Sequence, residues 1–292
     1  MPEKNIIKVR KILVVGLGLI GASLSRDLKN NSKYEKIYGY DHDHDVMQYA
    51  KDNNFVHNIK KDLNEGIADS DLIVLCVPVH SIINILDEIK IFFNGEKVFT
   101  DTLSNKNIIL KFLRDNKISN TKNFILSHPM AGTENYSIKN SQENLFNEAT
   151  TFICPLEYSD ESKVEEVKSM WRSVNSNTIN IDASNHDKLL TVLSHGPHAI
   201  SFALSKFTNR KGLFDEMPWS SSKGSLAEMV RVASSDPVAW ASIFDDNQDN
   251  LILYIDEYLE ELNKLKIILK SKKPEDLLNY LVASKQKNTK LK

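Results

Sequence analysis

The sequence predicts an α/β fold in which a doubly wound, mainly parallel sheet is followed by an all-helical domain. Over about the first 155 residues, short β-rich runs alternate with amphipathic stretches, which is the pattern of right-handed βαβ units. After residue 182, helical periodicity continues almost to the end. Because 292 residues suffice for two domains, we divide the chain into a domain over 1–182 and a second over 183–292.

The elements of the first domain follow from hydrophobic periodicity. The strands that it predicts are Lys11–Val15, Lys36–Asp41, Leu72–Val77, Lys97–Asp101, Asn123–Ser127 and Thr151–Cys154. Amphipathic segments between them predict helices, among them Ile20–Asn30, His80–Phe92 and Lys106–Asn116. The second domain is expected to contain the helical segments Asn185–Phe207, Ser225–Ala233, Pro237–Lys270 and Pro274–Ser284.

Two local signals shape the helical domain. Asp236 followed by Pro237 is typical of a helix start, and Pro197 removes a hydrogen bond from its helix and should bend it. Leu251–Leu269 repeats apolar residues at three- and four-residue spacing, the pattern of a core face or of a dimer contact.

Composition excludes several classes of function. The formal net charge is −2, which gives no general attraction to nucleic acid or to an anionic membrane. No apolar run approaches the roughly 20 residues of a membrane span, and the first residues lack a secretory signal. Cys76 and Cys154 lie in apolar segments without metal-binding spacing, so we expect buried reduced thiols and a cytoplasmic protein.

A glycine-rich turn follows the first strand and precedes a helix. It reads GLGLIG, from Gly16 through Gly18 to Gly21, and these are three of only ten glycines in the chain. Such glycines allow a tight turn, close approach of a pyrophosphate and close helix–strand packing. The next helix starts at this turn and offers the backbone N–H groups of Leu19 and Ile20 to phosphates. The turn therefore predicts a Rossmann-type dinucleotide site.

The end of the second strand predicts which dinucleotide binds. Asp41 lies where a carboxylate accepts hydrogen bonds from the adenosine ribose and repels a 2′-phosphate, so NAD is favoured over NADP. The run from Asp41 to Asp45 also contains two histidines, but it crosses from a strand end into a helix start, and we expect a capping cluster rather than a metal site. Val77 and Pro78 end the strand that should border the nicotinamide ribose.

Three further motifs predict the chemical end of the site. SHPMAGTE begins at Ser127 and places His128 at the carboxyl end of a strand, where ligands bind in doubly wound sheets. DTLSNK, which begins at Asp101, ends a neighbouring strand with hydroxyl groups. SHGPH, which begins at Ser194, places His195 and His198 three residues apart on a helix.

The order of these motifs resembles that of prephenate and arogenate dehydrogenases. GLGLIG, CVP, DTLSNK, SHPMAGTE, SHGPHAISFAL and MVRVASSDPVAW carry the resemblance from about residue 10 to about residue 245. It implies a Rossmann-type domain followed by a helical dimerisation domain, and hence a homodimer. It also implies an NAD-dependent oxidoreductase that converts prephenate to 4-hydroxyphenylpyruvate during tyrosine biosynthesis.

The resemblance assigns roles residue by residue. His128 is similar to the catalytic histidine of the family, and Ser104 to the serine that orients it. His198 and Arg231 resemble substrate-binding residues, with Arg231 as the carboxylate binder. Four other residues match positions lining the same pocket, namely Ser194, His195, Thr133 and Glu134. The remaining histidines are expected at the surface or at helix caps, and these are His42, His44, His57, His80 and His186.

The sequence departs from the family pattern at one place that bears on the substrate. A stretch often close to GGGFRDxTR reads KGSLAEMVR here, ending at Arg231, so glycines and a hydroxyl are lost. This leaves the choice between prephenate and arogenate open. The residues after the last helix are too few for a regulatory domain of ACT type, so we expect none.

Two further functions remain possible at this point. β-Hydroxyacid dehydrogenases combine a similar glycine turn with a helical domain, but they use a lysine where this chain offers histidines. A non-catalytic NAD-binding sensor would keep the fold and lose the chemistry, whereas Ser104, His128 and Arg231 are all present. A sensor would bind NAD without forming NADH.

Overall fold

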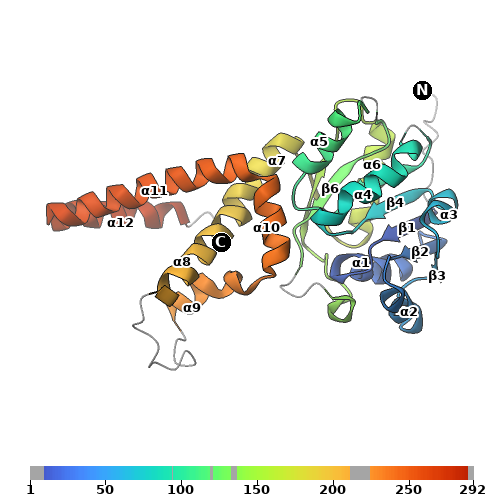
Figure 1. Ribbon diagram of the computed structural model, residues 1–292, viewed down its shortest axis with the longest axis horizontal. Helices are drawn as coiled ribbons and strands as arrows, with labels where there is room; N and C mark the ends of the chain where they lie inside the picture. Colours follow the sequence, from blue (N-terminus) through green and yellow to red (C-terminus); the bar gives the residue numbers. More distant parts are fainter. Residues whose placement is uncertain (1–9, 94, 119–120, 133–136, 211–223, 289–292) are drawn as a thin grey trace.

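A computed structural model describes residues 10–93, 95–118, 121–132, 137–210 and 224–288 (Figure 1). Its first five strands form one parallel sheet. They are β1 (Lys11–Val15), β2 (Lys36–Tyr40), β3 (Asn58–Ile59), β4 (Leu72–Leu75) and β5 (Val98–Asp101), in the order β3-β2-β1-β4-β5. The chain leaves β1 toward β2 on one side and later returns to β4 on the other. This reversal opens the crevice at the carboxyl ends of β1 and β4 where doubly wound sheets bind ligands.

Three further strands extend the sheet beyond β5. They are β6 (Leu126–Pro129), β7 (Thr150–Cys154) and β8 (Asn177–Asn180); β6 pairs antiparallel with β7, and β7 parallel with β8. A parallel bridge between Phe99 and Phe124 joins β5 to the start of this second group. The mainly parallel sheet of the prediction is confirmed, with β7 and β8 running opposite to the other strands.

Helices cover both faces of the sheet. Alternate residues of β1 point to opposite faces: Ile12 and Val14 belong to one buried cluster, and Leu13 and Val15 to the other. The first face is covered by α1 (Leu19–Lys29), α2 (His44–Asp52) and α6 (Glu161–Ser173). The second is covered by α3 (Leu63–Ala68), α4 (Val79–Ile89), α5 (Asn107–Asp115) and α7 (Ala183–Leu190). The sequence analysis did not single out α2, α3, α6, β3 or β8.

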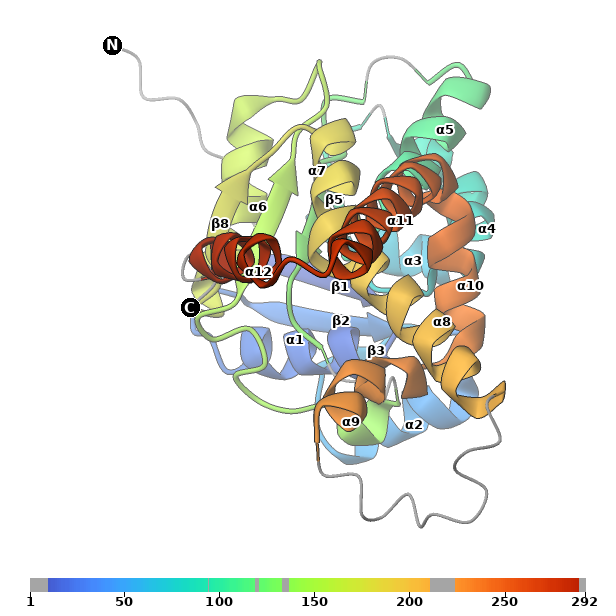
Figure 2. The ribbon, with the colours of Figure 1, turned by 90° about the vertical axis from the view of Figure 1, so that its left-hand side faces the viewer.

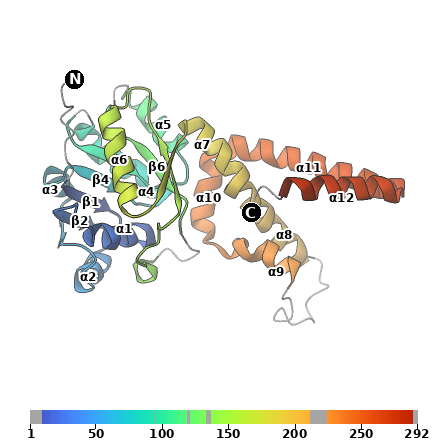
Figure 3. The same cartoon turned by 180° about the vertical axis from the view of Figure 1, so that it is seen from behind.

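The rest of the described chain is helical and lies at one end of the sheet (Figures 2 and 3). After α7 come a π turn (Thr191–His195), α8 (Gly196–Arg210), α9 (Ser225–Val230), a 3₁₀ turn (Arg231–Ser234), α10 (Pro237–Asp246), α11 (Gln248–Ser271) and α12 (Pro274–Asn288). The π turn ends two residues before Pro197, whose missing N–H interrupts regular helical hydrogen bonding. The helix predicted over Pro237–Lys270 is wrong as a single element, because Asn247 separates α10 from α11.

Helices α11 and α12 form a hairpin that extends away from the sheet (Figure 1). Many of their large apolar side chains face solvent in the single chain: Ile252, Leu253, Leu259, Leu262, Ile267, Leu269, Leu278, Leu281 and Val282. Extended apolar surface of this kind marks a contact with another molecule. Among the described residues, no helix combines the length and the apolar character that crossing a membrane requires.

Candidate active site

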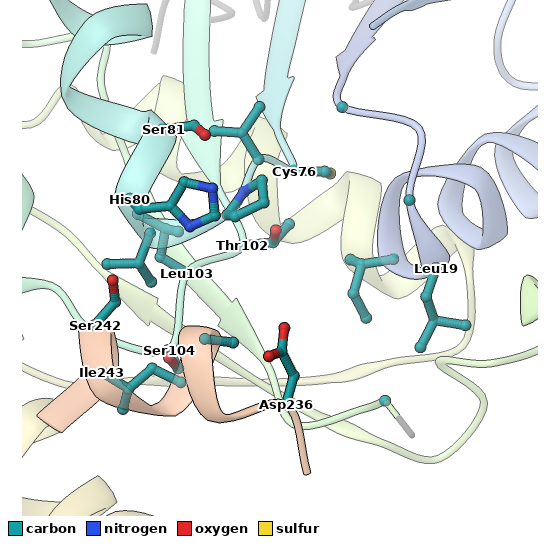
Figure 4. A pocket seen from close by; sticks show the side chains of 18 of the residues that line it. Leu19, Cys76, His80, Ser81, Thr102, Leu103, Ser104, Asp236, Ser242 and Ile243 are labelled. Atoms are coloured by element: carbon teal, nitrogen blue, oxygen red, sulfur yellow. The ribbon is translucent and has the colours of Figure 1, made fainter. Parts of the chain in front are cut away.

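One open cavity of about 1130 Å³ lies between the carboxyl edge of the sheet and the helical part. Its walls come from the turns after β1, β2, β4, β5 and β6, and from α7, α8 and α10. Pockets for drug-sized ligands have volumes of about 300–1,000 Å³, so this cavity has room for a dinucleotide beside a small second molecule. Figure 4 shows Ser104, Thr102 and His80 on its walls, with Asp236 entering from the start of α10.

The turn after β1 has the backbone geometry of a phosphate cradle. Gly16 adopts φ +90°, a value that disfavours side chains, and a Cβ there would lie 2.6 Å from the carbonyl oxygen of Cys76. A Cβ on Gly21 would meet the carbonyl oxygen of Gly16 at 1.9 Å. Gly18 caps α1 without any side-chain hydrogen bond. The first-turn N–H groups of Leu19 and Ile20 therefore remain available to an anion, as the sequence predicts.

Asp41 lines the same cavity, just after β2, and is 9% exposed. Its Oδ2 accepts a hydrogen bond from the backbone N–H of Leu17 at 2.7 Å, and its Oδ1 accepts from that of Asp43 at 3.0 Å. These contacts fix the carboxylate beside the glycine turn. His42 lies against it, with Nδ1 3.0 Å from Oδ1 of Asp41.

One of the neighbouring acidic residues caps a helix. Asp43 is the N-cap of α2, and its side chain accepts from the backbone N–H groups of Asp45 and Val46. No group of three or more histidine, cysteine or acidic side chains that could hold a metal occurs among the described residues.

The strand end after β4 also lines the cavity, through Cys76, Val77 and Pro78. Burial raises the pKa of the Cys76 thiol to about 12, so this cysteine stays protonated and carries no nucleophilic chemistry at neutral pH. Burial raises the pKa of Cys154 to about 12 as well.

His128 lies on β6, 8% exposed, and lines the cavity. Its Nδ1 lies 3.0 Å from Nε2 of His186, whose Nδ1 lies 2.7 Å from Oδ1 of Asp187. Because Nδ1 is engaged, Nε2 is the ring nitrogen left for a substrate. Burial, together with the charges of His186 and Lys106, holds the pKa of His128 well below 6.5. The imidazole is therefore neutral, and able to accept a proton, at neutral pH.

The expectation that His186 is a surface or capping residue is wrong. Its side chain is completely buried behind His128, against Phe152. His186 lies in the first turns of α7, and no local sequence signal separates it from an ordinary polar helix residue. Its neighbour Asp187 was not predicted as a site residue either, because the hydrogen-bond partners of both side chains include residues far away in the sequence. His80 lines the cavity at the start of α4.

Ser104 is half-buried on the cavity wall, two residues after Thr102 (Figure 4). The segment that carries it is fixed from behind by a fully buried ion pair between Lys106 and Asp101. Lys106 also donates to the backbone carbonyl of Ser127 at 2.7 Å, and Asp101 accepts from the backbone N–H of Ser127 at 3.0 Å. The pair thus ties the Ser104 turn to the strand that carries His128.

The helical part contributes Ser194, His195 and His198 to the cavity. The ring of His198 stacks on Trp240, with centroids 3.6 Å apart and an interplanar angle of 17°. Its Nδ1 donates to the carbonyl oxygen of Ser194 at 2.9 Å. Trp240, which the sequence analysis did not assign, therefore orients the ring of His198.

Three predicted substrate residues are not among the described residues that line the cavity. Arg231 is exposed and is not one of the lining residues, although its neighbour Val232 is. Thr133 and Glu134 lie outside the described residues. None of the described residues lining the cavity is a lysine or an arginine.

Two family models match the chain. The nucleotide-binding domain of prephenate dehydrogenase matches residues 24–180, and the dimerization domain of prephenate dehydrogenase matches residues 182–283. The first match begins after the glycine turn, so the evidence for that turn is its geometry.

Curated relatives and solved structures agree with this match. The chain is 25% identical over 275 residues to a prephenate dehydrogenase of Bacillus subtilis, covering 94% of this chain and 74% of that protein. It is 27% identical over 286 residues to a cyclohexadienyl dehydrogenase of Zymomonas mobilis, covering 97% and 96%.

Among solved structures, the fold is similar to prephenate dehydrogenase of Aquifex aeolicus in complex with hydroxyphenyl propionate and NAD+, with a TM-score of 0.88, 26% identity and coverage of 97% and 98%. It is also similar to Synechocystis arogenate dehydrogenase, with a TM-score of 0.82, 25% identity and coverage of 97% and 100%.

Proposed function

The chain belongs to the prephenate dehydrogenase family, and from that premise we propose that it oxidises prephenate with NAD and releases CO₂ and 4-hydroxyphenylpyruvate. The observation that carries this proposal is the position of His128. Its neutral imidazole lies at the carboxyl end of β6 in the cavity that also contains the glycine turn. A base and a dinucleotide site facing one cavity are what dehydrogenation of an alcohol requires.

The residues present fit NAD. The glycine turn and the start of α1 would hold the pyrophosphate, Asp41 would accept from the adenosine ribose, and Val77 and Pro78 would border the nicotinamide half. When bound, NAD supplies the hydride acceptor.

His128 would move the proton. Its Nε2 accepts a hydrogen bond from the C4 hydroxyl of prephenate and takes up the hydroxyl proton as C4 is oxidised. Ser104, on the facing turn, orients that hydroxyl. Loss of the ring carboxylate as CO₂ makes the ring aromatic, which supplies much of the driving force. The remaining task of the protein is to orient the reactants and exclude water.

Prephenate carries two carboxylates, so the site needs a cation. Arg231 directly precedes Val232 on the cavity wall, and we propose that it binds the ring carboxylate in a bidentate contact. Ser194, His195 and His198 would contact the rest of the substrate from the helical side. Thr133 and Glu134 retain the same proposed role.

A second candidate substrate is arogenate, in which an amine replaces the side-chain keto group. Relatives named cyclohexadienyl dehydrogenase and arogenate dehydrogenase are as similar to this chain as those named prephenate dehydrogenase. The stretch that ends at Arg231 reads KGSLAEMVR and differs from the family pattern, so it does not favour prephenate over arogenate.

We further propose that the protein is a homodimer formed through the apolar faces of α11 and α12. The match to the dimerization domain spans both helices for most of their length. Burial of their exposed leucines and isoleucines against another molecule would be favourable. A second copy supplies a surface of the same chemistry.

One experiment tests the proposed reaction. Purified protein is incubated with prephenate or arogenate and with NAD or NADP, and NAD(P)H absorbance is recorded for all four pairs. We expect NADH from prephenate with NAD. Binding of NAD without turnover of either acid would contradict the proposal and indicate a sensor.

A further inference from the structure

Three buried side chains form a hydrogen-bonded chain that starts at the cavity and ends at a helix terminus. His128, His186 and Asp187 are 8%, 0% and 3% exposed, and the two links between them measure 3.0 and 2.7 Å. The planes of the two imidazole rings are inclined by 75°.

The far end of this chain is fixed by backbone. Oδ1 of Asp187 accepts from the N–H of Lys106 at 2.9 Å, and Oδ2 accepts from the N–H of Asn107 at 2.8 Å, at the start of α5. Both backbone neighbours of the carboxylate are thus donors. With its oxygens accepting from the start of a helix, Asp187 accepts from Nδ1 of His186 as well.

The position of each proton follows from this end. Nδ1 of His186 carries hydrogen, because it donates to Asp187. Since the pKa of His186 is lowered, chiefly by burial, its ring is neutral at neutral pH and its Nε2 is an acceptor. Nδ1 of His128 must then donate to Nε2 of His186. The hydrogen of neutral His128 is therefore on Nδ1, and its Nε2 carries a free lone pair.

We propose that His186 and Asp187 are positioning residues that hold His128 in the Nδ1–H tautomer, the one tautomer in which its Nε2 can accept a proton from the substrate. The inference rests on the proposed role of His128 as the base. It extends that role to two residues that do not line the cavity, because neither His186 nor Asp187 is among the lining residues. An orienting carboxylate that fixes the tautomer of a catalytic histidine has a known counterpart in serine proteases, where a single Asp acts directly.

The sharpest variant is Asp187→Asn. An amide oxygen in the place of Oδ2 could accept from the N–H groups of both Asn107 and Lys106, which lie 2.8 and 3.1 Å from Oδ2, whereas the opposite orientation would set the NH₂ group against both donors. Its NH₂ group would then face Nδ1 of His186 and donate to it. The hydrogen of His186 would move to Nε2, and that of His128 would move to Nε2 as well. The variant would keep its shape but present a donor where a base is needed.

The first measurement is the tautomer itself, read from two-bond ¹H–¹⁵N spectra of histidine-labelled protein without substrate, with His128→Asn to assign the signal. We expect hydrogen on Nδ1 of His128 in the unchanged protein and on Nε2 in Asp187→Asn. Because this readout needs no turnover, it tests the inference even if prephenate is not the substrate. An unchanged tautomer in a folded Asp187→Asn protein would overturn the inference.

The second measurement separates kcat from KM. With the wrong tautomer, Asp187→Asn should lose about 10²–10⁴-fold in kcat, with the KM for NAD unchanged. Asp182→Asn is the matched control, since the Asp182 side chain caps α7 with the same kind of backbone contacts but has no hydrogen bond to a histidine side chain. It should keep the kcat of the unchanged protein. Equal losses of kcat in both variants would show a structural role for the α7 start instead.

A pair of substitutions at His186 keeps the inference testable if Asp187→Asn does not fold. His186→Gln retains an amide oxygen that can accept from Nδ1 of His128, whereas His186→Leu has no acceptor. We expect kcat to be about tenfold or more higher in the Gln variant than in the Leu variant, with similar melting temperatures. Equal kcat values in the two variants would overturn the inference.

Discussion

The side-chain amide of Asn247 lies 2.9 Å from Nδ1 of His195. The same amide nitrogen lies 3.1 Å from the carbonyl oxygen of Asp187 and 2.8 Å from Oγ1 of Thr191, and its two hydrogens are shared among the three contacts. Because an NH₂ group can only donate, Nδ1 of His195 is an acceptor. The hydrogen of this imidazole is therefore on Nε2, a buried atom that has no partner among the described residues. Because His195 lines the cavity, we expect Nε2–H to donate to the substrate or to the cofactor.

His195→Phe should therefore lower kcat/KM by about tenfold or more, since a buried donor and its acceptor both lose their contact. Burial lowers the pKa of His195 to about 4, so the ring is neutral above that pH and the loss should be the same at pH 6 and pH 8. Steady-state kinetics at both values checks this. His57→Phe, which changes a histidine outside the cavity, is the control. Unchanged kinetics in His195→Phe would contradict the assigned donor.

The carboxylate of Asp41 predicts cofactor choice. A 2′-phosphate would meet this fixed negative charge, and like charges at an interface cost up to several kcal/mol. We therefore expect kcat/KM to favour NAD over NADP by at least about tenfold. Asp41→Ser combined with His42→Arg should narrow the difference. Asp41→Asn removes the charge and keeps an acceptor for Leu17, although it loses the acceptor for the N–H of Asp43. Equal values with both cofactors would contradict the prediction.

Arg231 tests the proposed carboxylate contact. Truncating one partner of a desolvated charge pair costs about 2–5 kcal/mol. Arg231→Ala should raise the KM for prephenate strongly and leave the KM for NAD almost unchanged. Initial-rate measurements with each substrate varied in turn give both constants. A parallel rise in both would show that the residue supports the fold rather than the substrate.

The apolar face of α11 tests the proposed dimer. Leu259 is 51% exposed in the single chain, and Leu259→Glu would place a charge in the proposed contact. We expect sedimentation equilibrium to show a dimer for the unchanged protein and dissociation for Leu259→Glu, because an unpaired charge is costly in a desolvated interface. Ile91→Glu, at an exposed site in the sheet part, should remain dimeric. A monomeric unchanged protein would refute the dimer.

Most of the fold could be predicted from local patterns. The glycine turn, the buried runs of β1 and β4 and the start of α10 at Asp236 all carry signals that depend on neighbouring residues only. Where prediction was wrong, the cause was not local. The break at Asn247 lies within continuous helical periodicity, and the Asn247 side chain there contacts Asp187 and His195, which are far away in the sequence.

The site residues likewise divide into those that local motifs predicted and those that only tertiary packing reveals. Motifs predicted the positions of His128, Ser104 and His198 on the cavity, because each lies in a run of unusual residues. His186 was assigned to the surface, since only the packing of α7 behind β6 brings it to His128. The buried ion pair of Lys106 and Asp101 was not predicted either, although both residues belong to the DTLSNK motif.

The central claim is that His128 is the base for oxidation, and its pH dependence tests that claim most directly. A histidine whose pKa is lowered remains unprotonated at a lower pH than an ordinary histidine does. We therefore expect kcat/KM to be constant around neutral pH and to decrease only when the pH falls below the ordinary histidine pKa of 6.5. The measurement is the pH profile of kcat and kcat/KM with prephenate and NAD for the unchanged protein and for His128→Asn. We expect the variant to lose about 10²–10⁴-fold in kcat, to keep its affinity for NAD, and to lose the acid limb. A variant with near-native kcat, or with the same acid limb, would place the base elsewhere and contradict the account.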